Sequence, residues 1–167
     1  MSDVLVVYGT KTGCTAGIAE QIGAILVEAG LTADVHSVEK APGPSGYRAV
    51  IVGSGVRAGS WHGAVKEWVT AHAEALTSRP VAMFTACLTI ASDPDKADEV
   101  RAYTDPLLAE TGITPIDIGL FAGMNEPKAF SLPERLIMKA MKAPQGDFRD
   151  YEAVAEWTRG VAERMGL

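Results

Sequence analysis

Residues 4–15 read VLVVYGTKTGCT and decide the fold class of this 167-residue chain. The first five of them are a continuous apolar and β-branched run, which is typical of a strand buried on both faces of a sheet. After the glycine- and threonine-rich loop, apolar side chains recur at helical spacing, as at Ile18, Ile22 and Leu26. The stretch therefore predicts a buried strand, a tight loop and an amphipathic helix, which is the opening unit of a parallel α/β sheet.

The alternation of strand and helix continues along the rest of the chain. Apolar runs bounded by glycine and proline predict further strands at residues 33–38, 49–53, 80–86 and 114–121. Amphipathic or capped segments predict further helices at residues 63–76, 93–110, 132–142 and 150–165. Five strands alternating with helices imply an α/β fold with a parallel sheet covered on both faces. Right-handed crossovers favour a single domain over residues 1–167 with strand order 2-1-3-4-5.

The composition argues against several classes of function. A net charge of -6 disfavours nucleic acid as a partner, because a phosphate-binding face needs surplus lysine and arginine. No apolar run approaches the roughly 20 residues of a transmembrane segment, and the first residues show no signal-peptide pattern. Cys14 and Cys87 form neither a CxxC motif nor a Cys/His pattern, so no metal site is predicted. With no disulfide indicated, the cytoplasm is the expected location.

The loop at residues 10–15, TKTGCT, is the strongest candidate for a binding site. In a sheet of this strand order, ligands lie at the carboxyl ends of the strands, beside the first strand. Backbone N–H groups at a helix N-terminus bind anions, and Thr10, Thr12 and Thr15 add hydroxyl donors. The loop lacks the GxGxxG dinucleotide pattern and the GxxxxGK(S/T) triphosphate pattern, so a single phosphate monoester fits it better. An ordinary threonine-rich helix start is the alternative.

The same loop resembles the T/S-x-T-G-x-T phosphate loop of flavodoxins. The resemblance continues through residues 52–62 (VGSGVRAGSWH), 84–88 (FTACL) and 146–151 (GDFRDY), and so covers nearly the whole chain. It implies a flavodoxin-like three-layer sandwich with FMN as its cofactor. The first of these segments is most similar to one branch, the quinone-dependent protoporphyrinogen IX dehydrogenases and their flavodoxin-domain relatives. Relative to that branch, Thr12 stands in place of an acidic residue, and residues 124–144 form a shorter and less basic stretch.

The resemblance assigns the FMN contacts residue by residue. It places the phosphate on Thr10, Lys11, Thr12, Gly13, Cys14 and Thr15. It places the flavin ring against Ser54, Gly55, Val56, Arg57, Ala58 and Gly59 and against Thr85, Ala86, Cys87, Leu88 and Thr89, with Trp61 near the ring's edge. Flavin chemistry belongs to the cofactor, so the protein needs to supply only position, hydrogen bonds and charge. Gly53, Gly55 and Gly59 are expected to keep side-chain bulk away from the ring.

Several candidate side chains also have an ordinary structural interpretation. Trp61 is either a ring contact or a packing residue. Arg57 is either a substrate ligand or the partner of a carboxylate on a neighbouring helix. His62, the second candidate catalytic residue beside Arg57, is a proton donor, a helix N-terminal cap or a surface residue. Cys87 at the end of a buried strand is expected to be an apolar filler, and Lys11 is either a phosphate partner or a solvated lysine.

The resemblance implies an FMN-dependent oxidoreductase that passes electrons from a porphyrinogen to menaquinone, a step of heme biosynthesis. The alternative function is a flavodoxin-type electron carrier between redox-protein partners, and a third is a binding module without cofactor. Residues 132–142 combine an apolar face with Arg135, Lys139 and Lys142. This pattern predicts either peripheral contact with a quinone-bearing membrane or a helix packed on the domain with its charges in solvent.

Overall fold

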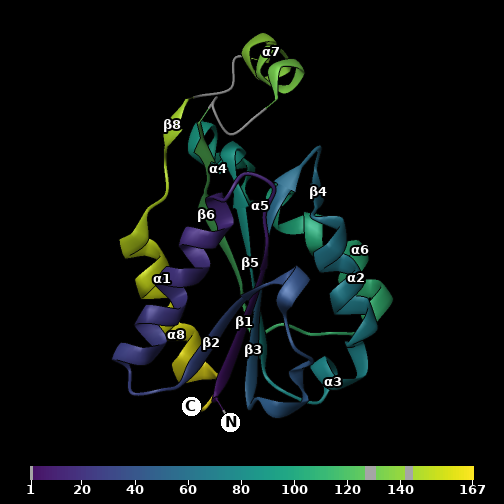
Figure 1. Ribbon diagram of the computed structural model, residues 1–167, viewed down its shortest axis with the longest axis vertical. Helices are drawn as coiled ribbons and strands as arrows, with labels where there is room; N and C mark the ends of the chain where they lie inside the picture. The colour runs from purple at the N-terminus through teal and green to yellow at the C-terminus, as the bar shows by residue number, and fades with distance from the viewer. Residues whose placement is uncertain (1, 127–130, 142–144) are drawn as a thin grey trace.

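The computed structural model describes residues 2–126, 131–141 and 145–167, and its centre is a parallel sheet between two layers of helices (Figure 1). Among the described residues, five strands run in the order β2-β1-β3-β5-β6, and each neighbouring pair is parallel. Their bounds are β1 (Val4–Gly9), β2 (Ala33–Ser37), β3 (Ala49–Arg57), β5 (Val81–Cys87) and β6 (Ile118–Ala122). This arrangement confirms the predicted five-stranded order 2-1-3-4-5 and the α/β flavodoxin-like class.

The side chains of β1 supply both faces of the sheet, because successive residues of a strand point to opposite sides. Val4 and Val6 pack with the helices of one face, and Leu5 and Val7 with those of the other. The first face is covered by α1 (Cys14–Glu28) and α8 (Tyr151–Arg164), and the second by α2 (Gly63–Ala71), α3 (Ala73–Thr77) and α6 (Asp105–Thr111) (Figure 1). All four β1 side chains are fully buried, as the continuous apolar run predicts.

Two helices that the sequence predicts as continuous are interrupted. The predicted helix at 93–110 divides into a 3-10 turn (Pro94–Lys96), α5 (Ala97–Arg101), a second 3-10 turn (Ala102–Thr104) and α6. Pro106 lies in the first turn of α6, and a proline has no N–H and crowds the carbonyl four residues earlier, so the α-helix cannot run through it. The predicted helix at 63–76 breaks at His72, between α2 and α3.

Two short elements and one strand boundary also differ from the prediction. A two-residue strand, β4 (Ser60–Trp61), turns back antiparallel on the end of β3. A short helix, α4 (Leu88–Ser92), follows β5 directly. The strand predicted at 114–121 begins only at Ile118. All three lie where chain direction changes, and local residue pattern is least informative there.

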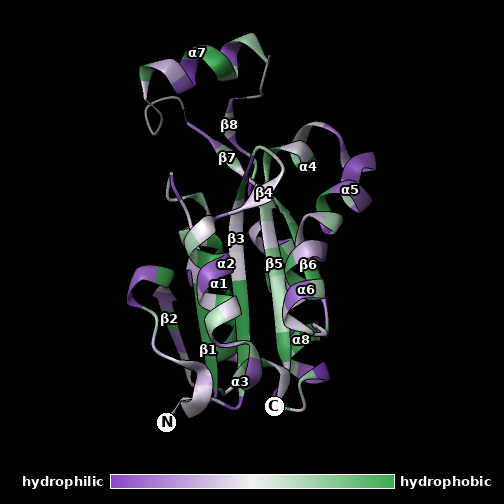
Figure 2. Cartoon of the chain, turned by 90° about the vertical axis from the view of Figure 1, so that its right-hand side faces the viewer, coloured by the Kyte–Doolittle hydropathy of each residue, from purple (hydrophilic) through white to green (hydrophobic). Residues whose placement is uncertain are grey.

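A short arm projects beyond the carboxyl ends of the strands. Its base is an antiparallel pair, β7 (Met124–Asn125) with β8 (Gly146–Asp147), and its tip is α7 (Leu132–Ala140). Figure 1 shows α7 at the end of the molecule opposite the termini, and Figure 2 shows that its residues range from hydrophilic to hydrophobic. The predicted helix at 132–142 is thus found over most of its length, and Lys142 lies outside the described residues. "The arm" below means β7, α7 and β8.

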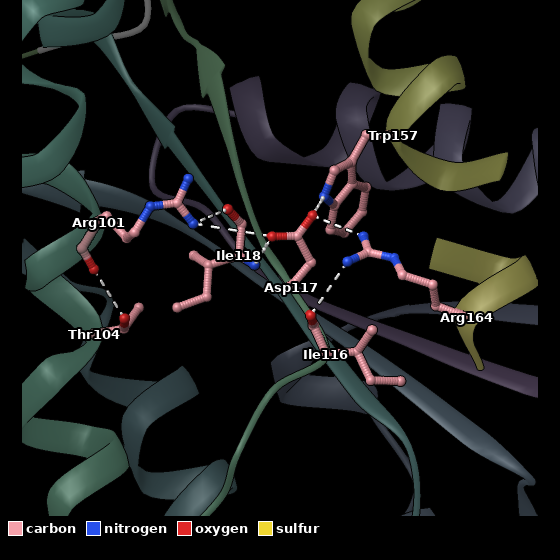
Figure 3. A network of polar contacts seen from close by, with 7 residues as sticks. All are labelled: Arg101, Thr104, Ile116, Asp117, Ile118, Trp157 and Arg164. Carbon is pink, nitrogen blue, oxygen red and sulfur yellow. Dashed lines mark hydrogen bonds and ion pairs between the residues drawn. The ribbon is translucent and has the colours of Figure 1, made fainter. Parts of the chain in front are cut away.

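A polar network holds α8 against the sheet at the end away from the arm, where β6 begins (Figure 3). Asp117, just before β6, accepts from Trp157 Nε1 at 3.1 Å and from Arg164 Nη2 at 2.8 Å. Burial opposes ionisation of Asp117, but the hydrogen bonds from Arg164 and the Ile118 amide outweigh it and lower its pKa. Because Asp117 lies at the amino end of β6, this network stabilises the fold and takes no part in a site at the carboxyl ends.

Candidate functional site

The phosphate loop, residues 10–15, forms a tight turn between β1 and α1. Gly13 is the N-cap of α1 with φ of 87°, a left-handed conformation that side chains rarely adopt. Its N–H donates to Thr10 Oγ1 at 3.0 Å, which closes the turn. No side chain caps the helix at this position. The first N–H groups of α1 therefore remain available to an anion, since the first turn of a helix lacks internal acceptors.

Thr15 adds a polar group that the protein itself does not satisfy. It is 1% exposed, and its Oγ1 is buried with no hydrogen-bond partner in the part of the chain that the structure describes. A Cβ built on Gly55, at the end of β3, would lie 3.1 Å from this oxygen. The hydroxyl thus lies between the first turn of α1 and β3. A buried unpaired hydroxyl costs about 1–3 kcal/mol, which a ligand with an acceptor oxygen would recover.

The ring loop, residues 54–59, is a hairpin at the end of β3. Val56 pairs with Trp61 and Arg57 with Ser60, and the two residues at the tip both have positive φ: 49° at Ala58 and 71° at Gly59. A positive φ is strained for alanine, and such strain is often found at functional loops. The hairpin therefore holds a defined backbone conformation beside the phosphate loop.

Two side chains at the base of the ring loop connect it to neighbouring elements. Ser54 is fully buried, and its Oγ accepts from the His62 N–H at 2.8 Å. Trp61 is 3% exposed, and its Nε1 donates to Thr85 Oγ1 at 3.0 Å. Trp61 is therefore a packing residue that joins the ring loop to the end of β5. Its contact with a ring stays a prediction.

The other predicted ring contacts lie at the end of β5 and in the turn that follows it. Thr85, Ala86 and Cys87 are buried within the strand, and Leu88 and Thr89 are half-buried in α4. Both groups lie at the carboxyl end of β5, next to the ring loop, since β3 and β5 are paired as far as Gly55 and Ala86. The structure therefore brings together the loops after β1, β3 and β5, as the predicted site requires.

His62 occupies the N-cap position of α2, but its side chain makes no capping hydrogen bond. Its ring lies against the end of β1, where a Cβ on Gly9 would be 3.3 Å from His62 Cγ. Its Nδ1 is buried and has no hydrogen-bond partner among the described residues. His62 is thus the helix N-cap by position but not through its side chain, and its buried Nδ1 is left without a partner among the described residues.

Gly53 was expected to keep side-chain bulk away from a cofactor ring, and that reason is wrong. A Cβ on Gly53 would overlap the ring carbons of Phe84 in the core, so this glycine makes room for a protein side chain and not for a cofactor ring. Gly55 faces Thr15, and Gly59 is needed for its positive φ. Only the latter two glycines are placed to shape the site.

A carboxylate from α7 binds the two cations of the site. Glu134 Oε1 accepts from Lys11 Nζ at 2.9 Å and from Arg57 Nη1 at 2.7 Å. The hydrogen bond from Lys11 first, and then those from Ser131 and Arg57, hold the pKa of Glu134 well below its ordinary value. The structural interpretation of Arg57, a partner of a carboxylate on a neighbouring helix, is therefore observed.

The base of the arm contacts the phosphate loop through Cys14. The Cys14 Sγ accepts from the Met124 N–H at 3.1 Å, and its carbonyl accepts from Arg149 Nη1 at 3.4 Å. Arg149 is itself held by both carboxylate oxygens of Asp147 in β8. Burial raises the pKa of the Cys14 thiol, so Cys14 supports the loop as a neutral side chain.

The described residues lack two further kinds of feature. No helix in them is both long enough and apolar enough to cross a membrane. No three or more histidine, cysteine, aspartate or glutamate side chains in them are grouped to hold a metal ion.

Sequence reasoning missed two parts of this site. Glu134 belongs to a Ser131-x-x-Glu134 capping box, a pattern that is visible in the sequence and predicts the start of α7. Its ion pairs with Lys11 and Arg57, which lie 123 and 77 residues away, have no local signal. The contact between Arg149 and Cys14 spans 135 residues and is equally invisible in the sequence.

Comparison with known proteins identifies relatives over almost the whole chain. A family model described as the flavodoxin domain matches residues 5–152. Protoporphyrinogen IX dehydrogenase (quinone) of Escherichia coli K12 is 27% identical over 169 residues, which cover 95% of this chain and 93% of the relative. The structure of oxidised flavodoxin 1 from Bacillus cereus has a TM-score of 0.63 at 15% identity, covering 97% of this chain and 98% of that one. Fusobacterium nucleatum flavodoxin bound to flavin mononucleotide has a TM-score of 0.57 at 13% identity, covering 99% of both chains.

Proposed function

The chain belongs to the flavodoxin domain family, and from this premise we propose that it is an FMN-dependent oxidoreductase. The observation that carries the proposal is the Thr15 hydroxyl, which is buried beside the first turn of α1 and has no partner among the described residues. A hydroxyl in that position costs stability unless a ligand accepts its hydrogen bond. A phosphate monoester supplies the acceptor oxygens and the negative charge that a helix N-terminus favours.

The residues present fit FMN at both ends. Thr10, Thr12, Thr15 and the first amides of α1 would hold the phosphate, with Lys11 adding positive charge. The backbone of the ring loop and of Thr85–Thr89 would hold the flavin ring, which is planar and needs the close approach that Gly55 and Gly59 permit. Bound FMN would supply the electron exchange, for which these side chains have no chemistry of their own. The role of the chain is to bind, to orient and to exclude water.

We infer further that the protein takes electrons from a porphyrinogen and delivers them to a quinone. The support is the 27% identity to a protein named protoporphyrinogen IX dehydrogenase (quinone), over 95% of this chain. His62, whose Nδ1 has no partner among the described residues, is the candidate proton-transfer group, and Arg57, which pairs with Glu134 in this structure, would exchange that partner for an anionic donor. An electron carrier between redox proteins is the alternative function, and it needs neither group.

The apolar face of α7 supports delivery to a quinone held in a membrane. Leu132, Leu136 and Ile137 are 69%, 62% and 58% exposed, and Arg135 and Lys139 lie on the same short helix. An exposed apolar face next to basic side chains suits the interface of an anionic bilayer. Peripheral contact with a membrane is therefore part of the proposed function, in place of a helix packed on the domain.

Turnover of both substrates tests this function. FMN-loaded protein mixed without oxygen with protoporphyrinogen and a menaquinone analogue is expected to form fluorescent protoporphyrin faster than the uncatalysed control. His62→Ala is expected to lower turnover by about 10²-fold with FMN still bound, because general acid–base catalysis contributes about that much. Flavin that is reduced by redox proteins yet inert towards porphyrinogen and quinone would favour the electron carrier instead.

Thr15→Val is expected to change stability and FMN affinity in opposite directions. Without FMN, the free energy of unfolding of the variant should be about 1 kcal/mol higher than that of the native protein, because an unpaired buried hydroxyl is removed. Its affinity for FMN should fall about 10- to 100-fold, because a hydrogen bond to a charged group is lost. Chemical denaturation and calorimetric titration measure the two effects.

Thr158→Val is the matched control. Thr158 is also a fully buried helical threonine, but its hydroxyl donates to the Val154 carbonyl at 2.7 Å. Its replacement should lower stability by about 1 kcal/mol and leave FMN affinity unchanged. If Thr15→Val destabilises the protein as Thr158→Val does, the hydroxyl already has a partner and the phosphate assignment loses its support.

A further inference from the structure

One carboxylate joins the two loops that are predicted to hold the two ends of the cofactor. Oε1 of Glu134 accepts from Lys11 Nζ at 2.9 Å and from Arg57 Nη1 at 2.7 Å. Lys11 belongs to the phosphate loop, and Arg57 to the ring loop. Because a single oxygen reaches both cations, α7 is connected to both loops. It lies at the end of the molecule opposite the two termini (Figure 1).

The orientation of this carboxylate is fixed from its other side. Glu134 Oε2 accepts from the Ser131 N–H and from Ser131 Oγ, both at 3.0 Å. The first of them is one half of the capping box at the start of α7, and in the other half the Ser131 side chain accepts from the Glu134 N–H. With two donors on each oxygen, Glu134 is held as an anion and couples the helix rigidly to the two loops.

Packing contributes little to the position of α7. None of its residues is buried, and large apolar side chains such as Leu136 are more than half exposed. Apolar burial is the main force that fixes helices on a domain, so α7 depends on polar contacts instead. The two ion pairs of Glu134 join it to the phosphate loop and the ring loop.

We propose that Glu134 is a latch that holds α7 over the cofactor site and so limits how fast a phosphate-bearing cofactor enters and leaves. The identity of the cofactor rests on the proposed function, whereas the latch itself does not. An exposed ion pair changes an equilibrium constant by up to about fivefold, and at about threefold each the two pairs together shift the ratio of closed to open α7 by roughly tenfold. A cover of this kind changes the association and dissociation rates together and leaves the affinity nearly constant.

Glu134→Gln tests the latch with the helix intact. Glutamine also serves at the third position of a capping box, so the variant loses the charge and keeps the start of α7. Stopped-flow fluorescence should show that FMN associates and dissociates about tenfold faster, with an affinity that changes by less than about threefold. Lys139→Gln is the matched control, because it also removes one charge from α7 but leaves the Glu134 carboxylate with all of its donors; its two rates should stay within about twofold of the native values.

A second measurement reports the position of α7 without any cofactor. Spin labels on Leu136→Cys in α7 and Val27→Cys in α1 occupy exposed sites, whereas the native Cys14 and Cys87 are buried. The distance distribution between the labels is expected to be narrow in the native background. It should broaden and lengthen with Glu134→Gln, and also in about 1 M salt, where exposed charges are screened within about 3 Å. Lys139→Gln should leave it narrow.

The two measurements separate the latch from the proposed function. An unchanged label distance in Glu134→Gln overturns the latch, whatever the flavin does. A longer distance with unchanged FMN rates overturns the claim that α7 covers the site. Failure of every variant to bind FMN refutes the proposed function, and the label distances alone then decide the latch.

Discussion

Replacing Gly53 with alanine is expected to lower the free energy of unfolding by about 3 kcal/mol, near the upper end of the range for overpacked cores. Gly53 lies in the middle of the sheet, and a Cβ there would overlap the ring of Phe84. Phe84 is fully buried and packs edge-to-face on Trp157, with Phe121 also beside it, so its ring has no open space to move into. Urea denaturation measures the loss.

Gly160→Ala is the control for this substitution. Gly160 lies within α8, and a Cβ there would meet no atom within 4 Å. Alanine should stabilise the helix by about 0.5–1 kcal/mol, because glycine loses more backbone entropy on folding. A Gly53→Ala variant as stable as the native protein would show that the Phe84 ring can move. It would then be open again whether this glycine keeps bulk away from a cofactor ring.

The central strands could be predicted because their sequence carries the whole reason for their position. Val4, Val6 and their neighbours in β1 are apolar on both faces, and only a strand covered by helices on both sides buries them all. The tight turn at residues 10–15 was predictable for a similar reason. Gly13 and Thr15 belong to one short segment, so residues that are close in the sequence are also close in the structure.

The rest of the site depends on contacts between distant residues. Glu134 meets Lys11 and Arg57 only because the arm brings α7 to the loops at the carboxyl ends of β1 and β3, and no local pattern encodes that placement. Gly53 was assigned to the cofactor because its partner, Phe84, lies on the adjacent strand and is invisible from the glycine's own neighbours. The break before α6 is a different case, because its signal, Pro106, is present in the sequence. The helical spacing of the residues around this proline predicted a continuous helix and obscured the signal.

FMN is expected to bind about 10³-fold more tightly than riboflavin, which differs from it by the phosphate alone. Two or three hydrogen bonds to a charged phosphate, each worth about 1.5–3 kcal/mol, account for this ratio. The donors are the Thr15 hydroxyl, the first amides of α1 and the hydroxyls of Thr10 and Thr12. In Thr15→Val, the ratio should shrink because the affinity for FMN falls and that for riboflavin does not.

Calorimetric titration of the cofactor-free protein with FMN and with riboflavin is the most direct test that this chain binds FMN through its phosphate loop. The account predicts one site for FMN and a riboflavin affinity about 10³-fold weaker. Equal affinities for the two ligands, or no heat of binding with FMN, would contradict it.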